Sequence, residues 1–248
     1  MSDLSIPGDG PSGATVHGSP GAGPRQRGMA RLAAPFLGGA LAAGWLLRAA
    51  VPYPALPARW AGLGLVLLAT GLAALAIHMR RRRLDFLRGA RGEEETARVL
   101  GGLGAETYVF HGLAVPHGGM AAGDIDHVVV SPAGVFVVET LNWAGRASIA
   151  GERLLYDGGP PDRDPVERVR QAAAALRERI RAAGIPAGVQ PVLCLPRAAL
   201  ARDVEGVAGV IVCRQAALPR VFAESTDSPM DAATVARIAD ILRPLTEE

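Results

Sequence analysis

The chain has 248 residues, which is enough for one domain of ordinary size together with additional segments. Its formal charge is +2, yet residues 84–248 hold 17 arginines against 22 acidic residues, a balance of −5. That balance excludes nucleic-acid binding driven by overall charge, so any such binding must use a local basic patch. All 26 basic residues are arginine, so no site in this chain can use a lysine amine of its own.

The N-terminal part divides into a polar tail and two apolar runs. Residues 1–30 are rich in Gly, Pro and Ser, and we expect this tail to be disordered because it can bury little apolar surface. The second run, Trp60–Met79, is uncharged and 20 residues long, and a helix of that length rises about 30 Å, the thickness of a hydrocarbon core. We therefore expect a two-helix transmembrane hairpin over residues 31–83, with spans of about 32–50 and 60–79. A signal-peptide core is the alternative for the first run.

Arginines flank the two apolar runs unequally. More of them lie outside the runs (Arg25, Arg27, Arg31 and Arg80 to Arg83) than between them (Arg48 and Arg59). By the positive-inside rule, both termini and the main domain are expected in the cytoplasm, in a multi-pass protein of the cell membrane. The run after the second span is suited to anchor the chain at lipid headgroups, so the lipid bilayer is an expected partner.

Residues 84–248 have the pattern of an α/β domain. We expect a helix over residues 85–103, a strand over 108–113, a Gly-rich loop over 117–123, and strands over 124–130 and 135–141. Ser131 to Gly134 join the last two strands and suit a type I turn, with Pro at its second position. These two strands are predicted to form a hairpin.

The C-terminal half adds two helices and two short strands. Asp164 is suited to cap a helix that begins at Pro165, Glu167 completes a capping box, and Gly184 ends the helix. Two apolar strands follow, Val189 to Leu195 and Val207 to Cys213, each with one cysteine that we expect to be a buried thiol. A last helix spans Asp231 to Leu242. The whole pattern predicts a mixed sheet flanked by helices.

The hairpin brings acidic residues together. If Val130 pairs with Val135, Asp126 lies opposite Glu139, and Asp124 lies opposite Leu141, all on one face of the sheet. Two facing carboxylates repel each other, so a divalent cation between them or protonation of one of them would explain the pair. Solvated carboxylates at a strand end are the alternative.

Three segments in this order resemble the nuclease-related domain (NERD) family. They are Gly89–Glu93, Asp124–Val130 and Gly134–Trp143, and the similarity covers about residues 85–200. The resemblance implies a restriction-endonuclease-like fold, in which an Asp and a Glu-x-Lys triplet build a magnesium-dependent phosphodiesterase site. The expected fold class is thus α/β, a restriction-endonuclease-like mixed sheet flanked by helices, preceded by the transmembrane hairpin.

The resemblance also assigns roles to single residues. By position, Asp126 and Glu139 would be catalytic carboxylates and ligands of Mg²⁺, and the backbone carbonyl of Thr140 would also reach the metal. Glu93 would be an accessory carboxylate. Leu141 stands at the position of the lysine, which in such sites positions the attacking water and stabilises charge on the phosphate. Leucine can do neither, so the resemblance implies little or no hydrolysis.

Four residues are candidates for contact with nucleic acid. Gln171 is expected to contact substrate, and Arg168 occupies the position of a second glutamine of the family. Arg146 is the nearest cation to Leu141 by sequence and can stabilise an anion, although its pKa is too high for a base. Trp143 either caps the hairpin base or stacks on a nucleobase. The arginines of this helix, from Arg163 to Arg181, either meet phosphates or are solvated helix positions.

The predicted function is a membrane-anchored, degenerate nuclease-like module. It would bind a divalent metal, nucleic acid (DNA or RNA), or both, with little or no hydrolysis. An active Mg²⁺-dependent nuclease is one alternative, and an interaction or scaffold module that keeps only the fold is another. His127 points to the face opposite Asp126, so we expect it to be packed in the domain rather than to act as a ligand.

Overall fold

The computed structural model describes residues 13–20, 38, 39, 41, 44, 70–75, 77, 89–117, 120–224 and 229–246, with only the backbone of residues 116, 117 and 120–124. Residues 1–23 and 89–248 form one compact unit, and residues 24–88 form a second. None of the helices in the described residues combines the length and the apolar character that a bilayer crossing requires. Most of the two predicted spans, about 32–50 and 60–79, lies outside the described residues, so the transmembrane hairpin stays a prediction.

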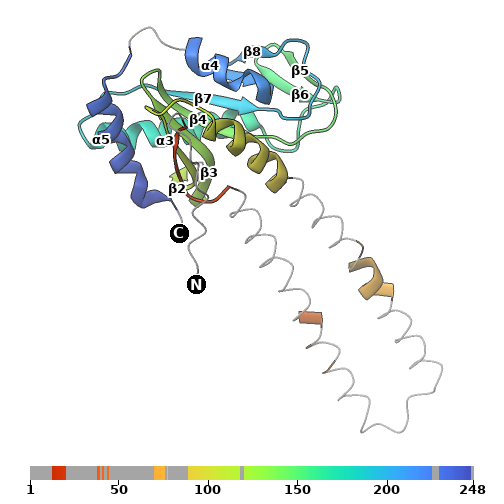
Figure 1. Cartoon of the computed structure of the whole chain (residues 1–248). Helices are drawn as coiled ribbons and strands as arrows, with labels where there is room; N and C mark the ends of the chain where they lie inside the picture. The colour runs from red at the N-terminus through yellow and green to blue at the C-terminus, as the bar shows by residue number, and fades with distance from the viewer. Residues whose placement is uncertain are drawn as a thin grey trace, which may run out of the picture. The chain divides into compact units, whose positions relative to one another are not determined.

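The first unit is built on a mixed sheet with the strand order β1-β2-β3-β4-β7-β9-β8 (Figure 1). The strands are β1 (Thr15–His17), β2 (Tyr108–His117), β3 (Met120–Ser131), β4 (Gly134–Thr140), β7 (Val189–Cys194), β8 (Val204–Val207) and β9 (Val210–Cys213). Strand β4 runs parallel to β7 and β7 runs parallel to β9, whereas β2, β3 and β4 form an antiparallel meander. A separate hairpin consists of β5 (Ala147–Ala150) and β6 (Arg153–Tyr156).

Helices cover both faces of the sheet. Helices α3 (Pro165–Ala182) and α5 (Ala232–Leu242) share a core with alternate strand residues such as Val128 and Val137. On the other face, the helix over residues 89–101 and helix α4 (Leu218–Glu224) share a core with the strand residues that alternate with the first set, such as Val129 and Val138. Two short 3-10 helices, Gln215–Ala217 and Arg243–Leu245, complete the elements. The predicted mixed sheet with flanking helices is confirmed.

Several local predictions are also confirmed. The hairpin register pairs Val130 with Val135, as the turn length predicts. Asp164 caps α3, since its Oδ1 accepts hydrogen bonds from the backbone N–H of Val166 at 2.9 Å and of Glu167 at 3.3 Å. The side chain of Glu167 differs from the expected capping box, because it accepts hydrogen bonds from Arg170 and Gln171 one turn further along the helix.

The N-terminal tail is the main difference from the sequence expectation. Residues 15–17 lie in the expected disordered segment, yet they form β1, which pairs in parallel with Tyr108 to Phe110 of β2. Thr15 also donates its backbone N–H to the carbonyl of Thr107 at 2.9 Å. Composition could not predict this strand, because its partners are backbone groups of an edge strand more than ninety residues away in the chain.

Other differences concern strands and a helix whose bounds differ from the sequence prediction or that the sequence pattern does not predict. The expected Gly-rich loop is much shorter, because β2 continues to His117 and β3 begins at Met120. The apolar run Val207 to Cys213, expected as a single strand, begins at the last residue of β8, turns at Ala208 and Gly209, both with positive φ, and continues as β9. The pair β5–β6 and helix α4 were not predicted at all. Both cysteines are buried free thiols, as expected.

Candidate functional site

The acidic pair lies where strand β4 ends. The register of β3 and β4 pairs His127 with Val138, and its continuation by one residue places Asp126 beside Glu139 on the face that α3 covers. Asp126 Oδ2 accepts a hydrogen bond from the backbone N–H of Thr140 at 2.8 Å, which ties the end of β4 to β3. The two carboxylates predicted to face each other are therefore brought together.

Arg168 of α3 enters this acidic site. Its guanidinium donates a hydrogen bond to Glu139 Oε2 and forms an ion pair with it. The Glu139 side chain is only 3% exposed, whereas that of Arg168 is 43% exposed, so the pair joins the interior to the surface. Asp164 and Pro165 start α3 at the point that places Arg168 in its first turn, and the helix cap thereby positions the cation.

The pKa values show which charges act on one another. Burial and the charge of Asp126 raise the pKa of Glu139 above its usual range, and Arg168 opposes this effect. The charge of Glu139 is the main cause that raises the pKa of Arg168, and the charges of Asp126 and Glu93 add to it. Three carboxylates thus act on a single guanidinium.

The helix over residues 89–101 completes the site from the other side. A Cβ at Gly92 would lie 2.8 Å from Cβ of Asn142, so only glycine lets this helix approach the chain after β4 so closely. Glu93, next to it, is 8% exposed. One turn on, Thr96 accepts a hydrogen bond from Thr140 Oγ1 at 3.3 Å, which links this helix to the end of β4. The Gly-x-x-Gly-Glu segment therefore has a packing role besides its acidic residue.

A cavity of about 530 Å³ opens beside the ion pair. Leu141, which the sequence resemblance predicts at the lysine position, lies in its wall and packs partly against the core. Trp143 and Tyr156 also line it, with ring centroids 4.6 Å apart. The lining residues are Glu139, Leu141, Trp143, Tyr156, Pro160, Pro161, Asp162, Arg163, Asp164, Pro165, Arg168 and Leu193.

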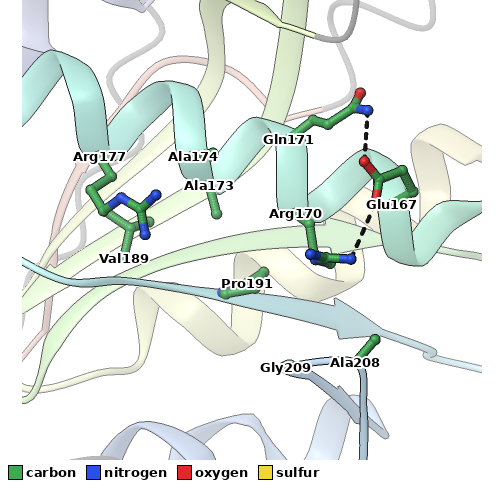
Figure 2. A pocket seen from close by; sticks show the side chains of 10 residues that line it. All are labelled: Glu167, Arg170, Gln171, Ala173, Ala174, Arg177, Val189, Pro191, Ala208 and Gly209. Carbon is green, nitrogen blue, oxygen red and sulfur yellow. Dashed lines mark hydrogen bonds and ion pairs between the residues drawn. The ribbon is translucent and has the colours of Figure 1, made fainter. Parts of the chain in front are cut away.

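Two predicted site residues lie elsewhere. Gln171 donates a hydrogen bond to Glu167 at 2.8 Å, and Figure 2 shows both beside a different cavity, together with Arg170. Arg146 has an exposed side chain, and it does not line the cavity next to Glu139. Its backbone N–H donates a hydrogen bond to Asp157 Oδ1 at 2.7 Å. The structure therefore separates Gln171 and Arg146 from the acidic pair, and their predicted contacts with nucleic acid stay predictions.

His127 is packed on the opposite face of β3, as predicted. Its Nδ1 lies 2.8 Å from Nδ1 of His111, and the two rings meet edge to face with centroids 4.9 Å apart. Burial lowers the pKa of His111 to about 4 and that of His127 well below its usual value. Both imidazoles are therefore neutral at physiological pH, and neither belongs to the acidic site.

The acidic site has some, but not all, of the features that a divalent metal ion requires. Carboxylate oxygens are the ligands that Mg²⁺ prefers, and Glu139 Oε1 is buried with no hydrogen-bond partner among the described residues. However, Glu139 Oε2 is held by Arg168. Within the described part of the chain, no three His, Cys, Asp or Glu side chains are grouped so that they could hold a metal. In this arrangement the residues do not fit a metal ion, because a guanidinium already neutralises the carboxylate.

The fold and the site define an α/β domain with an acidic centre at the ends of its central strands. Residues 88–196 match the nuclease-related domain family, and this part of the chain is a nuclease-related domain. The match covers the helix over residues 89–101, strands β2 to β7 and helix α3. Comparisons with curated proteins and with solved structures gave no match.

Sequence reasoning missed three features of this site. The sequence predicts Arg168 as a contact for nucleic acid or as a solvated helix position and not as the partner of Glu139, although a buried acid at a strand end requires a counter-charge. Tyr156 was missed because the β5–β6 hairpin was not predicted. Arg163 was placed with the other arginines of α3, but it precedes the helix and lines the cavity. Pro160 and Pro161, which precede Asp164, also line this cavity, and they are the feature of the sequence that marks this segment as a rigid loop.

Proposed function

We propose that this protein is a membrane-anchored, degenerate nuclease-related module that binds nucleic acid with little or no hydrolysis. The observation that carries the proposal is the ion pair between Arg168 and Glu139, in a site where leucine stands at the position of the lysine. The site keeps its acidic residues and a cavity next to them, but it lacks the amine that hydrolysis uses.

The missing lysine has a kinetic cost that can be stated. Removing one group that stabilises developing charge typically lowers the rate by about 10²–10³-fold. The Leu141 side chain is apolar and packs partly against the core, so it offers neither a proton nor a positive charge. Arg168 is cationic, but it is bound to Glu139 and its pKa is raised further, so it cannot act as a base.

Magnesium can bind at this site only if Arg168 moves away from Glu139. A divalent cation would need the Glu139 carboxylate, which Arg168 occupies, and two cations close together repel each other. Asp126 and Glu139, with the carbonyl of Thr140, can serve as ligands once Arg168 has moved away. Metal binding is therefore expected to be weak in the native chain.

The sequence motivates the membrane anchor, and the pairing of β1 restricts the topology that such an anchor can have. The two apolar runs and the arginines after the second run motivate a hairpin of two spans in the cell membrane. Strand β1 precedes these runs, and β2, with which it pairs, follows them. Both ends of residues 24–88 must therefore lie on one side of any membrane, which favours an even number of crossings over a cleaved or single span.

Two alternatives differ from this proposal in what they predict. An active Mg²⁺-dependent nuclease would cleave DNA or RNA and would lose that activity in Glu139→Ala. A scaffold module would bind neither metal nor nucleic acid. The cavity beside Arg168, with aromatic and arginine side chains in its wall, favours binding over a pure scaffold.

The test is to measure binding and cleavage in one experiment. The purified full chain is mixed with labelled single-stranded and double-stranded DNA and RNA in the presence of Mg²⁺ or Mn²⁺. The proposal expects a shift in mobility with intact nucleic acid. Cleavage that is lost in Glu139→Ala would establish the nuclease instead, and the absence of both binding and cleavage would leave the scaffold module.

A further inference from the structure

The cavity beside the ion pair has walls of two kinds. Its volume of about 530 Å³ lies within the range of about 300–1,000 Å³ that is typical of small-molecule sites. One wall carries Trp143 and Tyr156, and Pro160 and Pro161 lie close to Tyr156 in sequence. Arg163 and Arg168 belong to the part of the lining around the start of α3. A ligand that fills it should combine an apolar ring with a negative group.

The aromatic wall is held in place by the fold. Trp143 follows β4 directly and packs partly against the core. Tyr156 ends β6, where its backbone N–H donates a hydrogen bond to the carbonyl of Gly159 at 2.8 Å. The two rings lie against each other at a tilt of 36°, so each ring covers one face of the other and supports it from a separate segment, and the opposite face of Trp143 is left for a ligand. Every nucleobase has a flat face that can stack on such a surface.

The cationic side of the cavity offers donors beyond those that the ion pair uses. A guanidinium has five N–H donors, and the Arg168 side chain remains 43% exposed although it is bonded to Glu139. Arg163 lies on the exposed segment before α3, and it takes part in none of the ion pairs between the described residues. A phosphate between these two arginines could be bound by charge-assisted hydrogen bonds without a metal ion.

We propose that this cavity takes one unstacked nucleotide of a single-stranded nucleic acid, with its base on Trp143 and its phosphate on Arg163 and Arg168, and without a divalent cation. The inference rests on the proposed function and specifies the ligand of the same site. A double helix does not fit this arrangement, because its bases are stacked on one another and their faces are hidden. The local arginines also explain how binding can occur in a domain whose overall charge is negative.

The test uses the full chain and a fluorescein-labelled oligothymidylate in buffer with EDTA, followed by fluorescence anisotropy. Trp143→Leu should weaken binding by roughly 5- to 150-fold, the factor that one stack of a base on an aromatic ring contributes. Trp143→Phe should restore most of the affinity, since it keeps an aromatic face. Because Trp143 also touches the core, the exposed Arg163→Gln serves as a second variant and should weaken binding by several-fold.

Arg170→Gln is the matched control. Arg170 lies on the same helix as Arg168, but it pairs with Glu167 and lines the other cavity (Figure 2), so its loss should leave the affinity unchanged. Equal affinity for a duplex, binding that appears only with Mg²⁺, or wild-type affinity in both Trp143→Leu and Arg163→Gln would overturn the inference and leave the proposed function intact. If neither single-stranded nor double-stranded DNA or RNA binds under any condition, the proposed function fails as well.

Discussion

Arg168 of α3 donates a hydrogen bond to the carboxylate of Glu139 at the end of β4, and this contact neutralises the acid with a cation from the chain itself. Asp126 lies beside the pair on β3, and its charge acts on both partners. A carboxylate with so little exposure is costly unless it is paired. The chain therefore has an internal counter-ion in the place where a nuclease would be expected to hold a metal.

The first prediction concerns metal affinity. Arg168→Gln removes the competing charge from Glu139 and leaves a shorter, uncharged polar side chain. The affinity for Mn²⁺ should rise by at least roughly tenfold, since a unit charge a few ångströms from a divalent ion contributes more than about 1.4 kcal/mol even in a polar environment. Isothermal titration calorimetry of the full chain measures this change.

Arg170→Gln controls for the change in net charge. Arg170 is two residues from Arg168 on the same helix, and its partner Glu167 is about half exposed. Its substitution should leave Mn²⁺ affinity at the wild-type value. An Arg168→Gln variant that binds Mn²⁺ no better than wild type would show that the arginine does not exclude the metal.

The second prediction concerns stability at mildly acidic pH. Burial lowers the pKa of His111 to about 4, so between pH 6.5 and pH 4 the unfolded chain binds a proton there that the folded chain does not. The stability that this neutral imidazole contributes is present above pH 6.5 and is lost as the pH falls. His111 alone should lower the free energy of unfolding by about 2 kcal/mol between pH 7 and pH 5.

Denaturant titrations at several pH values test this dependence. The pKa of His127 is lowered in the same direction, because burial and the charge of His111 both disfavour its protonated form. The raised pKa of Glu139 changes the stability in the opposite direction over this range, so the test is the difference between two profiles. Between pH 7 and pH 5, the His111→Gln variant should lose about 2 kcal/mol less stability than the wild type, and parallel profiles of the two proteins would contradict the prediction.

The third prediction concerns the docking of the N-terminal strand. Gly18 has φ +81°, and a Cβ there would lie 2.3 Å from the backbone carbonyl oxygen of His111. Gly18→Ala should therefore disturb the pairing of β1 with β2 and speed amide hydrogen exchange at Thr15 to His17. Gly13→Ala is the matched control, because its Cβ would meet only Gly101 O at 3.5 Å, an ordinary contact. Equal exchange in both variants would contradict the role of Gly18.

The fourth prediction concerns membrane topology. Ser19 follows β1 and Glu178 lies on α3, so residues from before and after the predicted spans belong to one folded unit. Cysteines introduced by Ser19→Cys and Glu178→Cys should behave alike in whole cells: both are unreactive toward a membrane-impermeant maleimide, and both react after lysis. If only one of them is labelled in whole cells, the two segments lie on opposite sides and β1 cannot pair with β2.

Local patterns predicted the parts of the structure that depend on short-range chemistry. The cap at Asp164, the register of the β3–β4 hairpin and the pairing of Asp126 with Glu139 all follow from turn length, strand alternation and helix capping. The partner of Glu139 could not be predicted in the same way, because Arg168 reaches it across the fold from a different element. Strand β1 could not be predicted for the same reason, since it pairs with β2, which is more than ninety residues away in the chain.

The most direct test of the proposed degeneracy is to supply a lysine at position 141 and to remove the arginine that is bound to Glu139. A variant that combines Leu141→Lys with Arg168→Gln is compared with the wild type for Mg²⁺-dependent cleavage of single-stranded DNA and RNA. We predict that the wild type gives no cleavage above background and that the double variant gains activity of about 10²–10³-fold over it, the effect of one charge-stabilising group. Efficient Mg²⁺-dependent cleavage by the wild type, abolished by Glu139→Ala, would contradict the proposal that this nuclease-related domain has little or no hydrolytic activity.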